Sequence, residues 1–289
     1  MTDPLAELLR PARLTAVVDV GANPIDGDPP YKPLLERGLC TVIGFDPQPA
    51  SLDSLNQRKG PHETYLPYAL GDGCAHTLHV CHAPGMTGLL TPDPRTLSLL
   101  PLFPEFGRVE STAEVSTRAL DSIDEITDLD LLKIDVQGSE LMVFRSGQQK
   151  LSMAVAIQTE VSFLPLYQGQ PPFGEVDLEL RLQGFVPHAL VDTRRWIIAP
   201  LMVNDKPRQP LNQLVEADIV YVRDFREPEA FTDGQLAHLA LIAHHCYRSF
   251  DLALHCLLTL ERRGSVDQGA QARYLDILRS GPPQRLRPR

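Results

Sequence analysis

The chain has 289 residues, of which 43% are hydrophobic and 22% charged, so it holds enough apolar material for a sizeable core and is not a mainly disordered protein. Its formal net charge of −10 argues against a dominant nucleic-acid function, because phosphate binding requires a basic surface. No uncharged apolar run approaches the ~20 residues of a membrane span. The five cysteines lack CxxC spacing and no secretory signal opens the chain, so we expect a reduced, cytoplasmic location.

Apolar, β-branched runs that stop at an acidic residue recur along the first 160 residues. After a short leading helix over 4–10, such runs predict strands at 15–20, 40–45, 65–70, 129–134 and 154–159. Helical stretches follow the second and fourth runs, at 50–58 and 138–146. Strands that alternate with helices predict a mainly parallel sheet covered on both faces. Ligands of such sheets lie at the carboxyl ends of the strands, where the acidic residues gather.

The pattern changes after Gly184. The runs 185–191 and 194–201, joined near Asp192 and Thr193, predict an antiparallel hairpin, and 219–222 a further strand. Residues 234–262, broken near Ser249, and 267–279 have helical periodicity. We therefore expect an α/β protein with two parts: a main domain of residues 1–225 and a helical extension of residues 226–289. The apolar stripe of the extension packs either on the main domain or, as we favour, on a second subunit of a homo-oligomer.

Three acids at the predicted strand ends suggest one cofactor. The first glycine segment, 21–27, lacks the third Gly of the GxGxxG dinucleotide pattern, and Asp19 beside it suits a cationic or amine-bearing ligand. Asp46 is placed to accept from both hydroxyls of a ribose, and Asp72 from an adenine amino group. A cationic tail, ribose and adenine together describe S-adenosylmethionine. Each acid alone also fits the capping of a helix or turn.

Several segments resemble the FkbM-type methyltransferases. They are residues 18–23, 44–49, 68–72, 115–123, 132–140 and 160–167, in the right order within roughly 15–200. The most specific is Leu132-Lys-Ile-Asp-Val-Gln-Gly-Ser-Glu140. The resemblance implies a class I, Rossmann-like fold, S-adenosylmethionine as the methyl donor, and usually O-methylation of a hydroxyl on a sugar or natural product.

The resemblance also assigns cofactor-binding residues by position. Asp19, Gly21, Ala22 and Asn23 fall on the motif that faces the methionine part of the cofactor. Asp46, with Gln48 close behind it, falls on the ribose ligand, Gly71 and Asp72 on the adenine side, and Asp135 at the reacting centre. The chain departs from the family pattern at residues 24–30, where a proline- and aspartate-rich stretch replaces a small residue and Gly. That departure leaves the backbone contacts of this loop open.

Three residues are candidate general bases for an alcohol acceptor: Asp135, Glu160 and His82. The two acids close adjacent strands, and His82 precedes a loop with two glycines that is able to cover the acceptor. Each also has a structural interpretation, as a steric, capping or exposed residue. We expect Glu140 to favour a helix dipole and Lys133 to extend toward water at a sheet edge.

Two further segments contain residues typical of binding sites. Cysteines and histidines alternate over residues 74–82, but residues of opposite parity on a strand face opposite sides, so we expect no metal site there. The aromatic residues of 163–173 either wall an acceptor pocket or pack in the core.

The sequence thus predicts a methyltransferase that acts on a hydroxyl of a small molecule, sugar or glycan, with neither nucleic acid nor membrane as a partner. One alternative is a carboxylate acceptor, which is already ionised and needs no base. Another is a cofactor-binding scaffold or regulatory module that produces no S-adenosylhomocysteine. A nicotinamide-binding protein is disfavoured by the missing third Gly.

Overall fold

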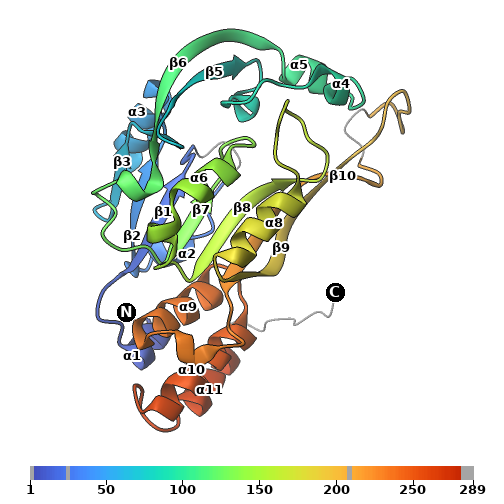
Figure 1. Cartoon of the computed structure of the whole chain (residues 1–289). Coiled ribbons are helices and arrows are strands. Elements are labelled where there is room, and N and C mark those ends of the chain that lie inside the picture. The colour runs from blue at the N-terminus through green and yellow to red at the C-terminus, as the bar shows by residue number, and fades with distance from the viewer. Residues whose placement is uncertain (1–2, 24–26, 207–209, 281–289) are drawn as a thin grey trace. The chain divides into compact units, whose positions relative to one another are not determined.

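The computed structural model describes residues 3–23, 27–206 and 210–280 (Figure 1). Its internal contacts divide the chain into two units, one of residues 1–16, 28–41 and 225–289 and the other of residues 17–27 and 42–224. The division into domains at residues 225 and 226 stays a prediction.

The main sheet has seven strands within the described residues. They are β1 (Thr15–Val20), β2 (Cys40–Phe45), β3 (Glu63–Leu66), β7 (Leu131–Ile134), β8 (Ala156–Ser162), β9 (Phe185–Trp196) and β10 (Gln213–Arg223), in the order β3-β2-β1-β7-β8-β10-β9. β3 pairs in parallel with β2, and β7 pairs in parallel with both β1 and β8. β10 is antiparallel to both β8 and β9. This arrangement confirms the expected class I, Rossmann-like sheet with an antiparallel edge hairpin.

The edge hairpin is built from other strands than those predicted. Residues 185–196 form one continuous strand, β9, and its partner is β10. Asp192 and Thr193, interpreted from sequence as a turn, lie opposite Asp218 and Ala217 in the ladder. The predicted turn at Asp192 and Thr193 is therefore wrong, because cross-strand pairing outweighs their local turn preference.

The third predicted strand is divided between two sheets. β3 ends at Leu66, and β4 (Ala69–Gly71) belongs to a small sheet with β5 (Ala75–Cys81) and β6 (Val109–Ala119), in the order β4-β6-β5. Pro67 lies at the break, and proline has no backbone N–H for a sheet ladder. Asp72 therefore follows a strand of the small sheet, and the prediction that it shares one sheet edge with Asp46 is wrong.

One face of the main sheet packs on helices α6 (Glu140–Ser146) and α8 (Phe173–Leu182). Val18, Leu132 and Ile157 share a buried core with Phe144 of α6 and Leu180 of α8. Side chains alternate between the two faces of a strand, so the intervening Asp19, Lys133 and Gln158 lie on the opposite face. These three are direct neighbours across β1, β7 and β8.

The remaining helices of this unit are short, apart from α3 (Pro49–Arg58), which follows β2. They are η1 (Pro84–Met86), α4 (Pro94–Leu97), α5 (Phe103–Phe106), η2 (Leu120–Ser122) and α7 (Gln148–Leu151). Of these, η1 bears on the site described below, because it follows β5 of the small sheet.

The other unit is helical and confirms the predicted C-terminal helices. It contains α1 (Pro4–Leu9), α2 (Lys32–Leu35), η3 (Pro228–Ala230), α9 (Asp233–His245), α10 (Phe250–Arg263) and α11 (Ala270–Ser280). Thr232 begins α9 with a capping box, and Gly264 ends α10 in the left-handed conformation. Residues 236–243 of α9 are all buried within the single chain. Self-association through these helices stays a prediction.

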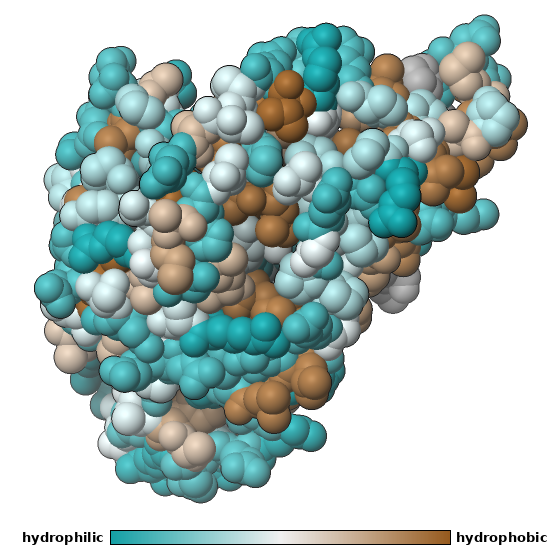
Figure 2. Space-filling view, turned by 45° about the horizontal axis from the view of Figure 1, so that its top comes forward, coloured by the Kyte–Doolittle hydropathy of each residue, from teal (hydrophilic) through white to brown (hydrophobic). Residues whose placement is uncertain are grey.

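The surface is mostly polar on the face seen in Figure 2, with apolar side chains in separate groups. The exposed large apolar residues include Leu178 and Leu182 of α8 and Leu190 and Val191 of β9. None of the helices in the described parts of the chain has both the length and the apolar character needed to cross a bilayer.

Candidate functional site

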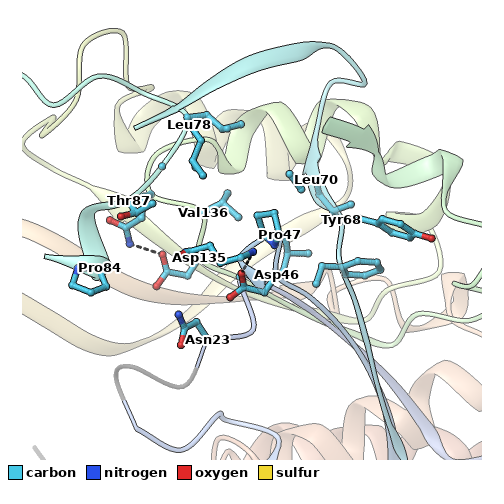
Figure 3. Close-up of a pocket in the computed structure, with 18 of the residues that line it drawn as sticks. Asn23, Asp46, Pro47, Tyr68, Leu70, Leu78, Pro84, Thr87, Asp135 and Val136 are labelled. Atoms are coloured by element: carbon cyan, nitrogen blue, oxygen red, sulfur yellow. Dashed lines mark hydrogen bonds between the residues drawn. The ribbon is translucent and has the colours of Figure 1, made fainter. Parts of the chain in front are cut away.

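A cavity opens at the carboxyl ends of β1, β2 and β7 (Figure 3). Its floor comes from the residues that follow these strands, and its roof from β5 and the loop after it. The lining residues are Val20, Gly21, Asn23, Phe45–Gln48, Tyr68–Leu70, Leu78, Pro84, Gly85, Thr87–Leu89 and Asp135–Gln137. The cavity has a volume of about 830 Å³ including its open mouth, within the range of cofactor sites.

The turn after β1 brings the backbone of Gly21 close to the backbone of Asp135, at the end of β7. Gly21 has a φ of 78°, and its N–H donates to the Phe45 carbonyl at 3.0 Å. A Cβ at this position would overlap the carbonyl oxygen of Asp135, so only glycine fits. Ala22 also donates its N–H to Phe45, but its side chain is buried and does not line the cavity.

Asp46 stands at the end of β2 with its carboxylate held on both sides. One oxygen accepts from the Gln48 N–H at 2.8 Å and the other from the Ser51 hydroxyl at 2.5 Å. The residue is 3% exposed, yet it lines the cavity. Each carboxylate oxygen has a second acceptor site, so the group is still able to receive two hydroxyls from one ligand.

An apolar compartment lies beside Asp46. Tyr68 packs on Phe45 with ring centroids 6.2 Å apart, and Leu70, Leu78 and Val136 complete the walls. Figure 3 shows Leu70, Leu78 and Val136 on the same side of the cavity. These surfaces suit a flat aromatic base next to a polar sugar.

Asp135 follows β7 and is connected to a second acid. The Gln137 side chain donates from Nε2 to Asp135 Oδ1 at 2.8 Å and to Glu160 Oε2 at 3.4 Å. The hydroxyl of Tyr167 donates to Gln137 Oε1 at 2.8 Å. The structure therefore brings together two of the three predicted base candidates, although only Asp135 lines the cavity.

Glu160 lies deeper, in an ion-pair network. Its carboxylate is 2.8 Å from Arg194, which is also 3.6 Å from Glu216. Burial, reinforced by Glu216, holds the pKa of Glu160 well above its usual value. Burial likewise raises the pKa of Glu216 to about 7 and that of Asp218 to about 6. Because these pKa values are raised, carboxyl groups on this side of the site keep protons at a higher pH than ordinary acids do.

Glu140 does more than favour a helix dipole. Its buried carboxylate accepts from the backbone N–H of Val136 at 2.9 Å and from that of Gly138 at 3.2 Å. It therefore holds the loop that carries Gln137. Burial, and secondarily Asp135, raise the pKa of Glu140 to about 7.

Asp19 and Lys133 form a buried ion pair, with the lysine Nζ 3.2 Å from the Asp19 carboxylate. Lys133 Nζ also donates to the Gly21 carbonyl at 3.1 Å. Burial lowers the pKa of Lys133, but Asp19 and Asp135 outweigh it and raise this pKa overall. The expectation that Lys133 extends toward water is wrong, and Asp19 is not among the residues that line the cavity.

Three other predicted residues lie outside the cavity. Asp72 accepts from His76 and from the Cys74 N–H, and these hydrogen bonds lower its pKa to about 2. Gly71 packs on Thr117 of β6, where a Cβ would lie within 3 Å of that side chain. His82 hydrogen-bonds Glu110 at 2.8 Å and is exposed. Cofactor or base roles for these residues stay predictions.

Across the described residues, no three His, Cys, Asp or Glu side chains are grouped so as to hold a metal ion. Residues 24–26, the first part of the departing loop noted above, lie outside the described residues.

Sequence reasoning missed Gln137, Tyr167 and Arg194 as parts of the site. Gln137 lies inside the most specific motif, residues 132–140, and its place there could have identified it as a site residue. Tyr167 belongs to the aromatic segment that was open between pocket and core; its ring is buried in the core, and its hydroxyl donates to Gln137, which lines the cavity. Arg194 lies on β9, and its approach to Glu160 depends on pairing of distant segments through β10.

The fold and the cavity define a class I methyltransferase. The chain belongs to the methyltransferase FkbM domain family, whose model matches residues 19–187, and it is an S-adenosylmethionine-dependent methyltransferase. The resemblance of its motifs to this family is thereby confirmed. No curated protein matches the sequence.

Solved structures of other methyltransferases are distantly similar. Precorrin-6y C5,15-methyltransferase from Geobacter metallireducens GS-15 is 10% identical with a TM-score of 0.38, covering 76% of this chain and 85% of that one. Magnesium protoporphyrin IX methyltransferase from Synechocystis PCC 6803 is 11% identical with a TM-score of 0.37 and 76% coverage of each chain. A putative tRNA (m1A22) methyltransferase from Streptococcus pneumoniae is 10% identical with a TM-score of 0.36, covering 99% and 91%.

Proposed function

We propose that this methyltransferase methylates a hydroxyl of a small molecule, sugar or glycan, with Asp135 as the general base. The observation that carries the proposal is the position of Asp135: it lines the cavity at the end of β7, and Gln137 holds one of its oxygens. A carboxylate held in this way is oriented for proton transfer before an acceptor arrives.

The cavity suggests how the cofactor lies. The ribose hydroxyls meet Asp46, and the adenine occupies the apolar compartment of Phe45, Tyr68, Leu70, Leu78 and Val136. The methionine part then extends over the turn at Gly21 and Asn23. This orientation places the sulfonium methyl on the Asp135 side, where the acceptor must approach in line with the breaking S–C bond.

The reaction follows from that placement. The acceptor oxygen attacks the methyl carbon, the C–S bond breaks, and its electron pair returns to sulfur to give S-adenosylhomocysteine. Asp135 accepts the proton of the hydroxyl. Glu160 is the weaker candidate base, because it is paired with Arg194 and does not reach the cavity wall.

The charges around the site favour a neutral acceptor over a carboxylate. The charge of Asp135 helps to raise the pKa of each of three nearby acids, which are Glu160, Glu216 and Asp218. Arg194 is shared among Glu160, Glu216 and Asp192, so it does not offset all of these acids. The raised pKa values of these acids show that a negative charge is already disfavoured on this side of the site, so a carboxylate acceptor would be disfavoured too, whereas a neutral hydroxyl adds no charge.

The experiment is a transfer assay with labelled S-adenosylmethionine and two matched panels, one of sugars and other polyols and one of carboxylic acids. We expect label in the polyol panel, with S-adenosylhomocysteine formed in equal amount. Label confined to the carboxylic acids would overturn the proposal. If the protein binds the cofactor but forms no S-adenosylhomocysteine with either panel, the result would favour the alternative of a cofactor-binding scaffold or regulatory module.

A further inference from the structure

We propose that Gln137 and Tyr167 are positioning residues that keep Asp135 and Glu160 together as one oriented pair of carboxyl groups. The inference rests on the proposed function, because it concerns the orientation of the proposed base. Neither residue is a base or nucleophile itself. Their task is to fix which carboxylate oxygen faces the cofactor.

The position of Gln137 is fixed by its backbone and by its neighbours. Its φ is 55°, and it follows Asp135 and Val136 in the loop that Glu140 holds. A Cβ on Gly88 of the roof would lie 3.0 Å from Gln137 Cβ, so the roof approaches this side chain closely. This close packing leaves the side-chain amide of Gln137 few alternative positions.

The amide orientation follows from its partners. Asp135 faces one end of the group at 2.8 Å and, as a carboxylate, requires a donor, so Nε2 is at that end, where it also donates to Glu160 at 3.4 Å. The other end then presents Oε1, which accepts from the Tyr167 hydroxyl at 2.8 Å. The reversed amide would set an oxygen against the Asp135 carboxylate. Each polar atom of Gln137 is therefore used in one orientation.

Tyr167 is suited to hold that orientation. Its side chain is 2% exposed and packs in an apolar cluster with Met86, Leu100 and Phe103. Its hydroxyl lies 2.8 Å from Gln137 Oε1 and 3.4 Å from the Met86 carbonyl of η1. The hydroxyl has a single proton, and Gln137 is the nearer acceptor. Tyr167 thus joins the roof segment to the two acids.

Removal of the amide donor has a specific electrostatic consequence. A hydrogen bond to a carboxylate stabilises its charged form, and two carboxylates without that bond repel each other. Other charged groups act on the pair from α6, β7, β9 and β10: they are Glu140, Lys133, Arg194, Glu216 and Asp218. Those groups are unchanged by a substitution at residue 137. We therefore expect loss of Gln137 to raise the pH at which the pair carries its full charge.

The test compares two ligands that differ by one charge. S-adenosylmethionine carries a sulfonium cation, and S-adenosylhomocysteine has a neutral sulfur in the same place. The dissociation constants of both are measured by calorimetry from pH 5 to pH 9 on the full chain. In the natural protein, the ratio of the S-adenosylhomocysteine to the S-adenosylmethionine constant should increase with pH, because burial raises the pKa of Glu160 and its ionised form favours the cation.

The variants are Gln137→Met, which keeps the length but removes the donor, and Tyr167→Phe, which removes one oxygen. The increase in the ratio should shift upward by about one pH unit in Gln137→Met, and in the same direction but less in Tyr167→Phe. Tyr221→Phe is the matched control, since Tyr221 is also buried and its hydroxyl donates to Asp177, away from the cavity. It should lose thermal stability without any shift of the ratio.

The outcomes separate the two proposals. Variants that lose stability but keep the pH profile of the natural protein would overturn the positioning role and leave the proposed function intact. A natural protein that binds S-adenosylmethionine no more tightly than S-adenosylhomocysteine at any of these pH values would instead refute the placement of the sulfonium beside Asp135, and with it both proposals. If Gln137→Met does not fold, Tyr167→Phe decides the question.

Discussion

Lys133 Nζ lies 3.2 Å from the carboxylate of Asp19, and the two residues are direct neighbours across β1 and β7. Lys133 also donates to the carbonyl of Gly21, whose turn lines the cavity. Asp19 was predicted to face the cofactor's methionine part. That role stays a prediction; the structure shows that Asp19 pairs with Lys133 and that Lys133 holds the turn.

The first prediction concerns this pair. Lys133→Met should lower the free energy of unfolding by ~3–5 kcal/mol, because it leaves the Asp19 carboxylate buried without its cation. The double variant Asp19→Leu with Lys133→Met should lose much less than the sum of the single variants. Urea unfolding of the four proteins measures this coupling. Additive losses would show that the two residues do not act together.

The second prediction tests the ribose site. Asp46→Ala should weaken S-adenosylhomocysteine binding by ~1.5–3 kcal/mol, the usual effect of losing hydrogen bonds to a charged group. Asp53→Ala removes an exposed acid from α3, the helix that follows Asp46, and should leave the affinity unchanged. Calorimetry at one pH compares them. Equal affinities for the two variants would contradict the ribose assignment.

The sequence predicted the parts of the site that depend on strand ends. Asp46 and Asp135 were identified because each follows a buried apolar run, and parallel strands present such ends at one edge. Asp72 followed a similar run, but Pro67 interrupts it, and the chain enters another sheet before Asp72 is reached. A local pattern does not reveal which sheet a short strand joins, because that choice depends on long-range pairing.

Side-chain connections were harder to predict than strands. Gln137 and Tyr167 are 30 residues apart, and Arg194 and Glu160 are 34 apart, yet each pair is hydrogen-bonded at 2.8 Å. The position of Arg194 depends on β10, which lies between β8 and β9 although it follows both in the chain. No periodicity in residues 185–201 contains that information, and for this reason the continuous strand β9 was interpreted as a hairpin.

The third prediction is the dependence of stability on pH. The pKa of Glu140 is about 7 in the folded protein, above the ordinary value of 4.5, so the folded state binds a proton more readily than the unfolded state. The free energy of unfolding should therefore fall as pH rises from about 4.5 to 7, by at most ~1.4 kcal/mol per pH unit for one such group. Glu216 and Asp218 act in the same direction.

Glu140→Gln isolates the contribution of this residue. The amide oxygen still accepts from Val136 and Gly138 but never ionises, so the variant should lose less stability than the natural protein between pH 5 and 8. Guanidinium unfolding at several pH values measures the difference. A slope identical to that of the natural protein would show that Glu140 is not protonated in the fold.

The fourth prediction concerns Asp135. Once an acceptor is known, Asp135→Asn should reduce turnover ~10²–10⁴-fold, the usual contribution of a general base, with little change in cofactor affinity. The loss should shrink at high pH, where hydroxide begins to replace the base. A pH–rate comparison measures both effects. If turnover is unchanged in Asp135→Asn and falls in His82→Asn, the base has been misassigned.

The most direct measurement is a crystal structure of the full chain with S-adenosylhomocysteine. The account predicts the ribose hydroxyls within hydrogen-bond distance of Asp46, the adenine between Tyr68, Leu70 and Leu78, and the sulfur on the Asp135 side of the cavity. A ligand bound outside this cavity, or one whose ribose does not reach Asp46, would contradict it.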